Sequence, residues 1–347
     1  MGSRHLKEQR SLFLMMDQSF GIHPVSEEPT GGTTREAAVC LLCRGADSRC
    51  ISRLSCADLL KAWAQLGVRF SEQAWAVLCE RNEVELLECQ ECGFRFFDGT
   101  LAGEGTFYAE LQKQIAAYYA GVRPEFRWTL KLARKLSLRT VLDVGCGAGS
   151  FLDLAQSAGM MTYGIELNVQ AAEISRRKGH CIYPGLLADL EREHPAERFD
   201  LITAFQVLEH VADPIGFLAD AKRLLHARGF IAVGVPNEKG LHRLCPWDPH
   251  QWPPHHVTRW RRDDLRYLGK ATQLELVRLG SDLLVGGEAE YFWNLHNKFA
   301  SALGKKKYPG NSLLPCFLSL LYRLSGCKFV FPRRGPNIYA LYKPSMS

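Results

Sequence analysis

The sequence predicts an α/β protein in which a mainly parallel sheet is covered by helices on both faces. From about residue 137 onward, apolar runs typical of buried strands alternate with segments of helical periodicity. Residues 141–144 form one such run, three glycines at alternate positions follow it, and a helix-like segment begins near Ser150. Two Cys-x-x-Cys motifs lie upstream of this region, so we also expect a small N-terminal module.

The first hundred residues divide into a tail and this module. Residues 1–35 are polar and bear glycine, serine and threonine, which predicts a poorly ordered tail. Residues 36–100 carry the paired cysteines Cys40, Cys43, Cys89 and Cys92. Four thiolates form a closed tetrahedral site, so we expect a zinc-ribbon-like module with structural Zn²⁺; four buried thiols without metal are the alternative. The long insert between the pairs contains two helix-like segments, near 56–64 and 71–78.

Residues 101–136 are predicted to form a helical connector or lid. One helix-like stretch contains Phe107 and Tyr108, and Pro124 suits the first turn of another helix that runs to about Leu136. Residues 137–347 then form the sheet domain. Strands are expected near 140–144, 162–166, 181–183, 200–204, 230–235, 274–279 and 336–342. Helices are expected near 149–158, 168–178, 214–226 and 262–268, with a helical insert near 285–330.

The glycine turn after the first of these strands points to a ligand. Glycines 145, 147 and 149 let backbone N–H groups approach a bound molecule, and Asp143 before them would attract a cation and repel an anion. Glu166, at the end of the next strand, is placed to accept hydrogen bonds from ribose hydroxyls. Strand ends of this kind meet at one edge of a parallel sheet, so Asp143, Glu166 and Gln206 are expected to face one crevice. A glycine-rich turn without a ligand is the alternative.

These motifs together resemble class I S-adenosylmethionine-dependent methyltransferases over about residues 120–347. The resemblance implies a Rossmann-like, seven-stranded methyltransferase sheet and S-adenosyl-L-methionine as the cofactor. It implies a cofactor-binding role for ten residues: Asp143, Gly145, Cys146, Gly147, Gly149, Glu166, Leu167, Leu187, Phe205 and Gln206.

The N-terminal part carries a resemblance of its own. Residues 88–99 are similar to the metal-binding module of some sugar C-methyltransferases, where the module precedes the catalytic domain and helps close over the acceptor. In those relatives, aromatic residues of the connector cover the methyl donor or reach the acceptor. Tyr118 and Tyr119 are the candidates here, with packing at a domain interface as the alternative.

His210 is the candidate general base for methyl transfer. It follows the fourth predicted strand at the mouth of the crevice, and a neutral histidine suits that role. Glu209 would orient it or contact the acceptor. In the sugar C-methyltransferases the histidine of this Glu-His pair resembles the catalytic base, although a tyrosine precedes the pair there and Leu208 precedes it here. A histidine that caps the following loop is the structural alternative.

The sequence leaves undecided whether this side of the crevice also binds a metal. Ubiquinone-pathway O-methyltransferases and small-RNA end methyltransferases, which this region also resembles, carry a metal-binding Glu-x-x-Glu-His motif. Gln206 replaces the first glutamate here, which weakens a site for a hard cation.

The resemblance also places the loop 247–260 over the acceptor. Adjacent histidines point different ways in most backbones, so we expect at most one of His255 and His256 to function, and His256 is the candidate.

Composition limits the class of protein. The chain has 347 residues, a net charge of +6, 46% hydrophobic and 23% charged residues, which is typical of a soluble globular protein. No apolar run approaches the ~20 residues of a membrane span, and no signal-peptide core is evident, so a cytoplasmic location with reduced cysteines is expected. The basic residues are scattered, so we do not expect nucleic acid as a partner.

The sequence therefore predicts methyl transfer to a small-molecule acceptor, such as a sugar, a glycolipid precursor or another secondary metabolite. One alternative is a protein or nucleic-acid methyltransferase that recognises its substrate through the zinc module. The other is a non-catalytic interaction protein built on that module, against which the intact Asp143 and Glu166 argue.

Overall fold

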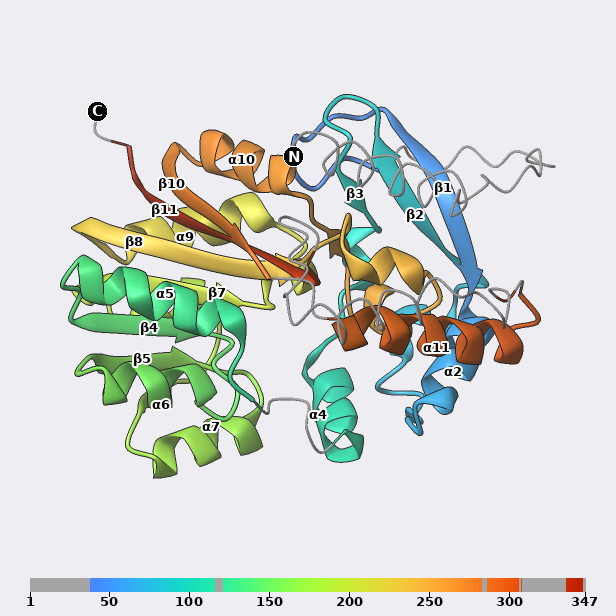
Figure 1. The fold of residues 1–347 in the computed structure, drawn as a ribbon, viewed down its shortest axis with the longest axis horizontal. Helices are drawn as coiled ribbons and strands as arrows, with labels where there is room; N and C mark the ends of the chain where they lie inside the picture. The colour runs from blue at the N-terminus through green and yellow to red at the C-terminus, as the bar shows by residue number, and fades with distance from the viewer. Residues whose placement is uncertain (1–37, 116–120, 283–285, 306, 308–334, 346–347) are drawn as a thin grey trace, which may run out of the picture.

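The computed structural model describes residues 38–115, 121–282, 286–305, 307 and 335–345, and these form two sheets with helices around them (Figure 1). The predicted tail 1–35, Tyr118, Tyr119 and most of the insert beyond residue 305 lie outside the described residues. Within the described part of the chain, no helix is long and apolar enough to cross a membrane.

The larger sheet has seven strands in the order β10-β11-β8-β7-β4-β5-β6. The five strands from β4 to β8 pair in parallel, whereas β11 pairs antiparallel with both β8 and β10. The strands are β4 (Thr140–Val144), β5 (Met161–Ile165), β6 (Cys181–Tyr183), β7 (Phe199–Phe205), β8 (Leu225–Pro236), β10 (Leu274–Ser281) and β11 (Asn337–Pro344). This confirms the predicted Rossmann-like sheet.

Helices cover both faces of this sheet, as predicted. One face carries α5 (Pro124–Lys135), α6 (Ser150–Ser157) and α7 (Val169–Arg177), and the other carries α8 (Leu187–Glu193), α9 (Pro214–Arg223) and α10 (Arg262–Ala271). The strand period of two divides the core between them: Val141 packs in the α5–α6 cluster, and its neighbour Leu142 packs in the α9–α10 cluster. Both side chains are fully buried. Helix α8 was not predicted, because seven residues are too few for a clear helical period.

The smaller sheet has the order β1-β2-β3-β9 and is antiparallel throughout. Its strands are β1 (Ser48–Ser55), β2 (Glu83–Cys89), β3 (Arg95–Phe96) and β9 (Thr258–Arg259). Strand β9 follows the loop that contains His255 and His256, so a late segment of the chain completes a sheet that the early segments begin.

The remaining helices lie around the small sheet and the cavity described below. Helix α2 (Cys56–Gln65) begins where predicted, since Ser55 caps its first turn by accepting a hydrogen bond from the Asp58 N–H. The second predicted helix of the insert is reduced to α3 (Ala76–Cys79), and in the turn before it Trp75 stacks on Phe70. The others are α4 (Gly105–Gln114), α11 (Gly286–Ala302) and the 3-10 helices η1 (Gly99–Leu101), η2 (Leu208–His210), η3 (Leu241–Leu244) and η4 (Pro249–Gln251).

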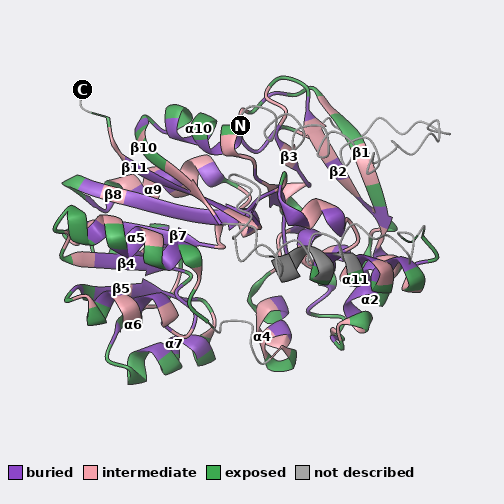
Figure 2. Cartoon of the chain, in the orientation of Figure 1, coloured by how far each residue is buried: buried purple, intermediate pink, exposed green. Residues whose placement is uncertain are grey.

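The two sheets share one core. Three aromatic residues in or next to the small sheet are fully buried: Phe94, Phe96 and Trp260. They belong to the same core cluster as Leu265 and Leu268 of α10. Figure 2 shows the buried residues running along the large sheet and continuing into β3. The small sheet is therefore fixed against the α10 face of the large one.

Candidate active site

The glycine turn has the conformation that its sequence predicts. Gly145, Gly147 and Gly149 all have positive φ, of 71°, 53° and 82°, which a residue with a side chain rarely adopts. The N–H groups of Gly145 and Cys146 both donate to the Ile165 carbonyl at the end of β5, at 2.8 and 3.1 Å. The turn therefore ties the carboxyl ends of β4 and β5 together, and Gly149 leads directly into α6.

Two carboxyl groups lie beside this turn. Asp143 is buried and accepts a hydrogen bond from the Thr203 hydroxyl at 2.6 Å, and its burial raises its pKa to about 7. Glu166 accepts from the Gly147 N–H at 2.8 Å and from the Asn168 N–H at 2.7 Å. Burial also raises the pKa of Glu166 above its usual value. The site is thus negatively charged only when these groups ionise, and a bound cation would favour that ionisation.

A single cavity of about 970 Å³ opens at this edge of the large sheet. Eight of the ten predicted cofactor residues line it: Asp143, Gly145, Cys146, Glu166, Leu167, Leu187, Phe205 and Gln206. Gly147 and Gly149 shape the turn without lining the cavity. The expectation that Asp143, Glu166 and Gln206 face one crevice agrees with this arrangement.

The same cavity is lined at its other end by histidines. His210 lies in η2, just after β7, where Gln206 adopts an unusual φ of 58° that turns the chain back toward the cavity. One ring nitrogen from each of His210, His255 and His256 lies within 4.8 Å of the others. Both members of the adjacent pair face this cluster, so the expectation that they point different ways is wrong. Their ring planes differ by only 32°, because the loop curls back on itself before β9.

Hydrogen bonds fix the orientation of two of these rings. His210 Nδ1 contacts the His255 carbonyl, and His255 Nδ1 lies 2.9 Å from the His250 carbonyl. A carbonyl only accepts, so each Nδ1 carries the hydrogen and each Nε2 carries the lone pair. Burial lowers the pKa of His210 to about 4 and lowers those of His255 and His256 well below their usual value. The three rings are therefore neutral near pH 7.

Glu209 is the least satisfied group of the site. Its side chain is 1% exposed, and neither carboxyl oxygen has a hydrogen-bond partner among the described residues. The nearest basic atom is His256 Nε2, 4.0 Å from Oε1. Burial raises the pKa of this carboxyl to about 8. A buried polar group without a partner is costly, so Glu209 is suited to receive one from a ligand.

Sequence reasoning missed the contribution of Tyr108 on α4. Its hydroxyl lies 3.0 Å from His210 Nδ1 and donates to the His255 carbonyl at 3.2 Å. It thereby joins the connector to the histidine cluster. An aromatic residue on a helix gives no signal of such a contact, because packing in the core produces the same pattern. Tyr118 and Tyr119, which were the candidates, lie outside the described residues.

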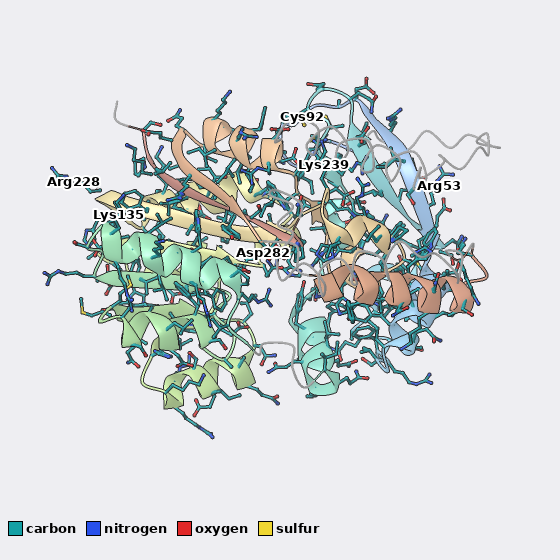
Figure 3. All side chains as sticks on the ribbon, in the orientation of Figure 1. Arg53, Cys92, Lys135, Arg228, Lys239 and Asp282 are labelled. Carbon is teal, nitrogen blue, oxygen red and sulfur yellow. The ribbon has the colours of Figure 1, made fainter. Side chains whose placement is uncertain are left out.

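The four predicted zinc ligands form a second cluster, away from the cavity. Cys43 Sγ lies 3.5 Å from Cys89 Sγ, and Cys40 Sγ lies 3.7 Å from Cys92 Sγ. All four sulfurs are within 4.8 Å of one another. In a tetrahedral zinc site, bonds of about 2.3 Å place neighbouring sulfurs about 3.8 Å apart, so this cluster fits the ion. Cys92 lies at the end of the small sheet that faces α10 (Figure 3).

Comparison with known proteins agrees with the fold. Residues 108–279 match the family model described as a methyltransferase domain. The chain therefore carries a methyltransferase domain of class I, the S-adenosylmethionine-dependent type.

Individual relatives carry related names. A ubiquinone biosynthesis O-methyltransferase from Bradyrhizobium sp. is 28% identical over 159 residues, which cover 40% of this chain and 63% of the relative. One from Haemophilus ducreyi is 32% identical over 123 residues, covering 32% of this chain and 51% of that relative. The matches thus span less than two thirds of these relatives. Among solved structures, a SAM-dependent methyltransferase from Archaeoglobus fulgidus is 14% identical and covers 68% of this chain and 99% of its own, with a TM-score of 0.43.

Proposed function

We propose that this protein transfers a methyl group from S-adenosylmethionine to a small-molecule acceptor. One observation carries the proposal: the Asp143 and Glu166 end and the histidine end belong to the same cavity. At about 970 Å³, that cavity has room for a cofactor and an acceptor together. The methyl donor would lie over the glycine turn, with its ribose at Glu166, and the acceptor would lie against the histidines.

The chemistry needs little beyond position and the removal of one proton. An acceptor atom attacks the methyl carbon in line with the carbon–sulfur bond, which breaks and leaves neutral S-adenosylhomocysteine. The acceptor's proton must leave as the new bond forms. We propose His210 as the base, because the His255 carbonyl holds the hydrogen on Nδ1 and leaves the lone pair on Nε2. Glu209 would bind a second polar group of the acceptor or stabilise the protonated ring.

The acceptor class follows from the relatives and from the lining of the cavity. The relatives are named O-methyltransferases, which favours a hydroxyl acceptor. Neutral imidazoles and the Glu209 carboxyl suit a polar, uncharged molecule such as a sugar, a glycolipid precursor or another hydroxylated metabolite. Phe292 and Tyr291 of α11 line the cavity as well and would cover apolar parts of such a molecule.

The cysteine cluster is proposed to hold structural zinc. Cys40, Cys43, Cys89 and Cys92 supply four thiolates and leave no open position for a substrate. The ion would close the small sheet, whose strand β9 continues directly from the histidine loop.

Cofactor binding is the direct test of the proposed function. S-adenosylmethionine and S-adenosylhomocysteine should each raise the melting temperature, since a ligand at 100 times its Kd stabilises a protein by about 2.7 kcal/mol. Asp143→Asn and Glu166→Gln should weaken binding measured by calorimetry. Glu173→Gln, an exposed change on the neighbouring helix α7, is the matched control. If millimolar cofactor gives no stabilisation of the wild-type chain, the proposal is wrong.

A further inference from the structure

The three clustered histidines share features that a base alone does not require. The His210 ring centroid lies 4.8 Å from those of both His255 and His256, which are 4.5 Å from each other. They come from two segments that the backbone fastens together, since the Val257 N–H donates to the Glu209 carbonyl at 2.8 Å. Three imidazoles therefore converge at a fixed place in the cavity wall.

We propose that His210, His255 and His256 bind one divalent transition-metal ion at the acceptor end of the cavity. Imidazole nitrogen is a preferred ligand of zinc, cobalt and nickel ions. Bonds of 2.0–2.1 Å would place the three nitrogens about 3.3 Å apart, so separations of at most 4.8 Å require only small ring rotations. Three protein ligands leave a position open toward the cavity, as in catalytic rather than structural sites.

The contacts of the other ring nitrogens support this assignment. A histidine that binds a metal through one nitrogen almost always donates the other N–H to a carbonyl, carboxylate or water. His210 and His255 each place Nδ1 against a backbone carbonyl. Both rings are thus held in the tautomer and orientation that a metal ligand needs.

Glu209 provides an independent observation. It is a buried carboxyl with no hydrogen-bond partner for either oxygen among the described residues, and Oε1 lies 4.0 Å from His256 Nε2. No Lys or Arg forms an ion pair with it in the described part of the chain. An ion held by the neighbouring rings would favour the ionised form of this carboxyl and give its oxygens a partner.

This ion would differ in chemistry from the one at the cysteines. Four thiolates enclose a structural ion, whereas three imidazoles beside a cavity leave it open to an acceptor oxygen. A hydroxyl bound there would lose its proton more readily. The ion would occupy the lone pair of His210, so metal and base are alternative means of activating the acceptor. Only this catalytic consequence rests on the proposed function, because ion binding does not require methyl transfer.

Loading the full-length chain with Co²⁺ tests the site. Thiolate-bound Co²⁺ absorbs strongly in the near ultraviolet by charge transfer, whereas imidazole-bound Co²⁺ shows only weak visible bands. We expect two equivalents of Co²⁺ in the wild-type chain. A His255→Asn/His256→Asn variant should retain the charge-transfer band and lose one equivalent, and Cys43→Ser should lose the band. His226→Asn, which changes an exposed histidine at the start of β8, is the matched control.

If the double variant does not fold, a measurement on the wild-type protein alone still tests whether the histidines bind an ion. Calorimetric titration of Co²⁺ into chain that already carries one equivalent of zinc, at the cysteines, should show one equivalent of Co²⁺ binding at the histidines. A total of one metal ion per chain at saturation, or a second ion that is still bound by the folded double variant, overturns the proposal. S-adenosylhomocysteine binding measured on the same samples separates the outcomes. Cofactor binding without a second ion refutes only this inference, and a second ion without cofactor binding refutes only the proposed function.

Discussion

The two sheets of this molecule are stabilised in different ways. The seven-stranded sheet buries apolar side chains on both faces under six helices, and its parallel strands are nearly continuous apolar runs. In the small sheet, β3 and β9 are two residues long, and β1 buries only one of its eight residues. Four cysteines lie together at the end of this sheet where β1 begins and β2 ends. We infer that a sheet with strands this short depends on a metal at the cysteines, whereas the large sheet does not.

The histidine cluster lies where the two regions meet. The Phe97 N–H donates to the Val257 carbonyl, the Val257 N–H donates to the Glu209 carbonyl, and both distances are 2.8 Å. Thr258 Oγ1 also donates to the Leu208 carbonyl at 3.0 Å. The end of the histidine loop is therefore held by the small sheet on one side and by η2 on the other. We infer that the large sheet alone forms the cofactor end of the cavity, and that the acceptor end needs both.

Removal of one of the proposed zinc ligands should have the largest effect on the difference between the two sheets. Structural zinc contributes about 10–16 kcal/mol of apparent free energy in small domains, so Cys43→Ser should unfold the small sheet. Zinc content should fall by one equivalent, and hydrogen exchange should increase at residues 255–258. S-adenosylhomocysteine binding should persist, because Asp143, the glycine turn and Glu166 belong to the large sheet.

Cys50→Ser is the matched control, since Cys50 is an exposed cysteine on β1 outside the cluster. It should leave both zinc content and hydrogen exchange unchanged. Loss of cofactor binding together with zinc would show that the two regions fold as one unit, and that result would contradict the comparison.

The difference between the cofactor end and the acceptor end of the cavity also explains which features the sequence could predict. The glycine turn, Glu166 and the strand–helix alternation are local patterns, and the structure confirms the fold they indicate. The cysteine pairs were recognisable because their spacing is itself the motif, although the sequence could not show that the sulfurs approach to 3.5–3.7 Å.

The acceptor end was less predictable, because its geometry depends on contacts between distant segments. His255 and His256 converge because β9 pairs with β3, and this pairing joins residues 258–259 to residues 95–96. The Tyr108 contact with His210 likewise depends on how α4 lies across the cavity. Intrinsic preferences and local periodicity contain no information on either pairing, so the directions of the two histidines were predicted wrongly.

The glycine turn offers a test confined to the large sheet. An added Cβ at Gly149 would lie 2.6 Å from Ser175 Oγ, whereas at Gly159 it would meet nothing within 4 Å. Both glycines have φ above 80°, so Gly159→Ala measures backbone strain alone, about 1–2 kcal/mol. Gly149→Ala adds overpacking and should cost about 3 kcal/mol in the free energy of unfolding. Denaturant unfolding measures both, and equal losses would show that the close contact with α7 is unimportant.

Cofactor affinity should depend on pH through Asp143. Burial raises its pKa to about 7, so the carboxyl is mostly neutral at pH 6 and mostly ionised at pH 8. A cationic ligand lowers that pKa by favouring the ionised form, so affinity for S-adenosylmethionine should rise by about tenfold between these values. The raised pKa has the opposite effect on folding: the free energy of unfolding of the ligand-free chain should fall as pH rises toward 7.

Asp143→Asn separates this effect from the rest of the site, since the amide retains an acceptor for the Thr203 hydroxyl and cannot ionise. Its cofactor affinity should be weak at both pH values and nearly independent of pH. A wild-type affinity that stays constant, or that falls, from pH 6 to pH 8 would show that Asp143 does not sense the ligand's charge.

The smallest expected effect concerns an ion pair at the surface. Among the described ion pairs, this one links the loop after Cys43 to the start of α9. Arg44 Nη2 lies 2.7 Å from Asp213 Oδ1, but both side chains are more than half exposed, at 54% and 55%. Such pairs contribute about 0.2–1 kcal/mol and weaken with salt. Arg44→Ala should therefore lower the free energy of unfolding by less than about 1 kcal/mol, and the difference should vanish in 1 M NaCl. Arg49→Ala, which removes a pair within the small sheet, is the control. A loss of several kcal/mol from Arg44→Ala alone would mean that surface charge, and not β9 and the shared core, holds the two regions together.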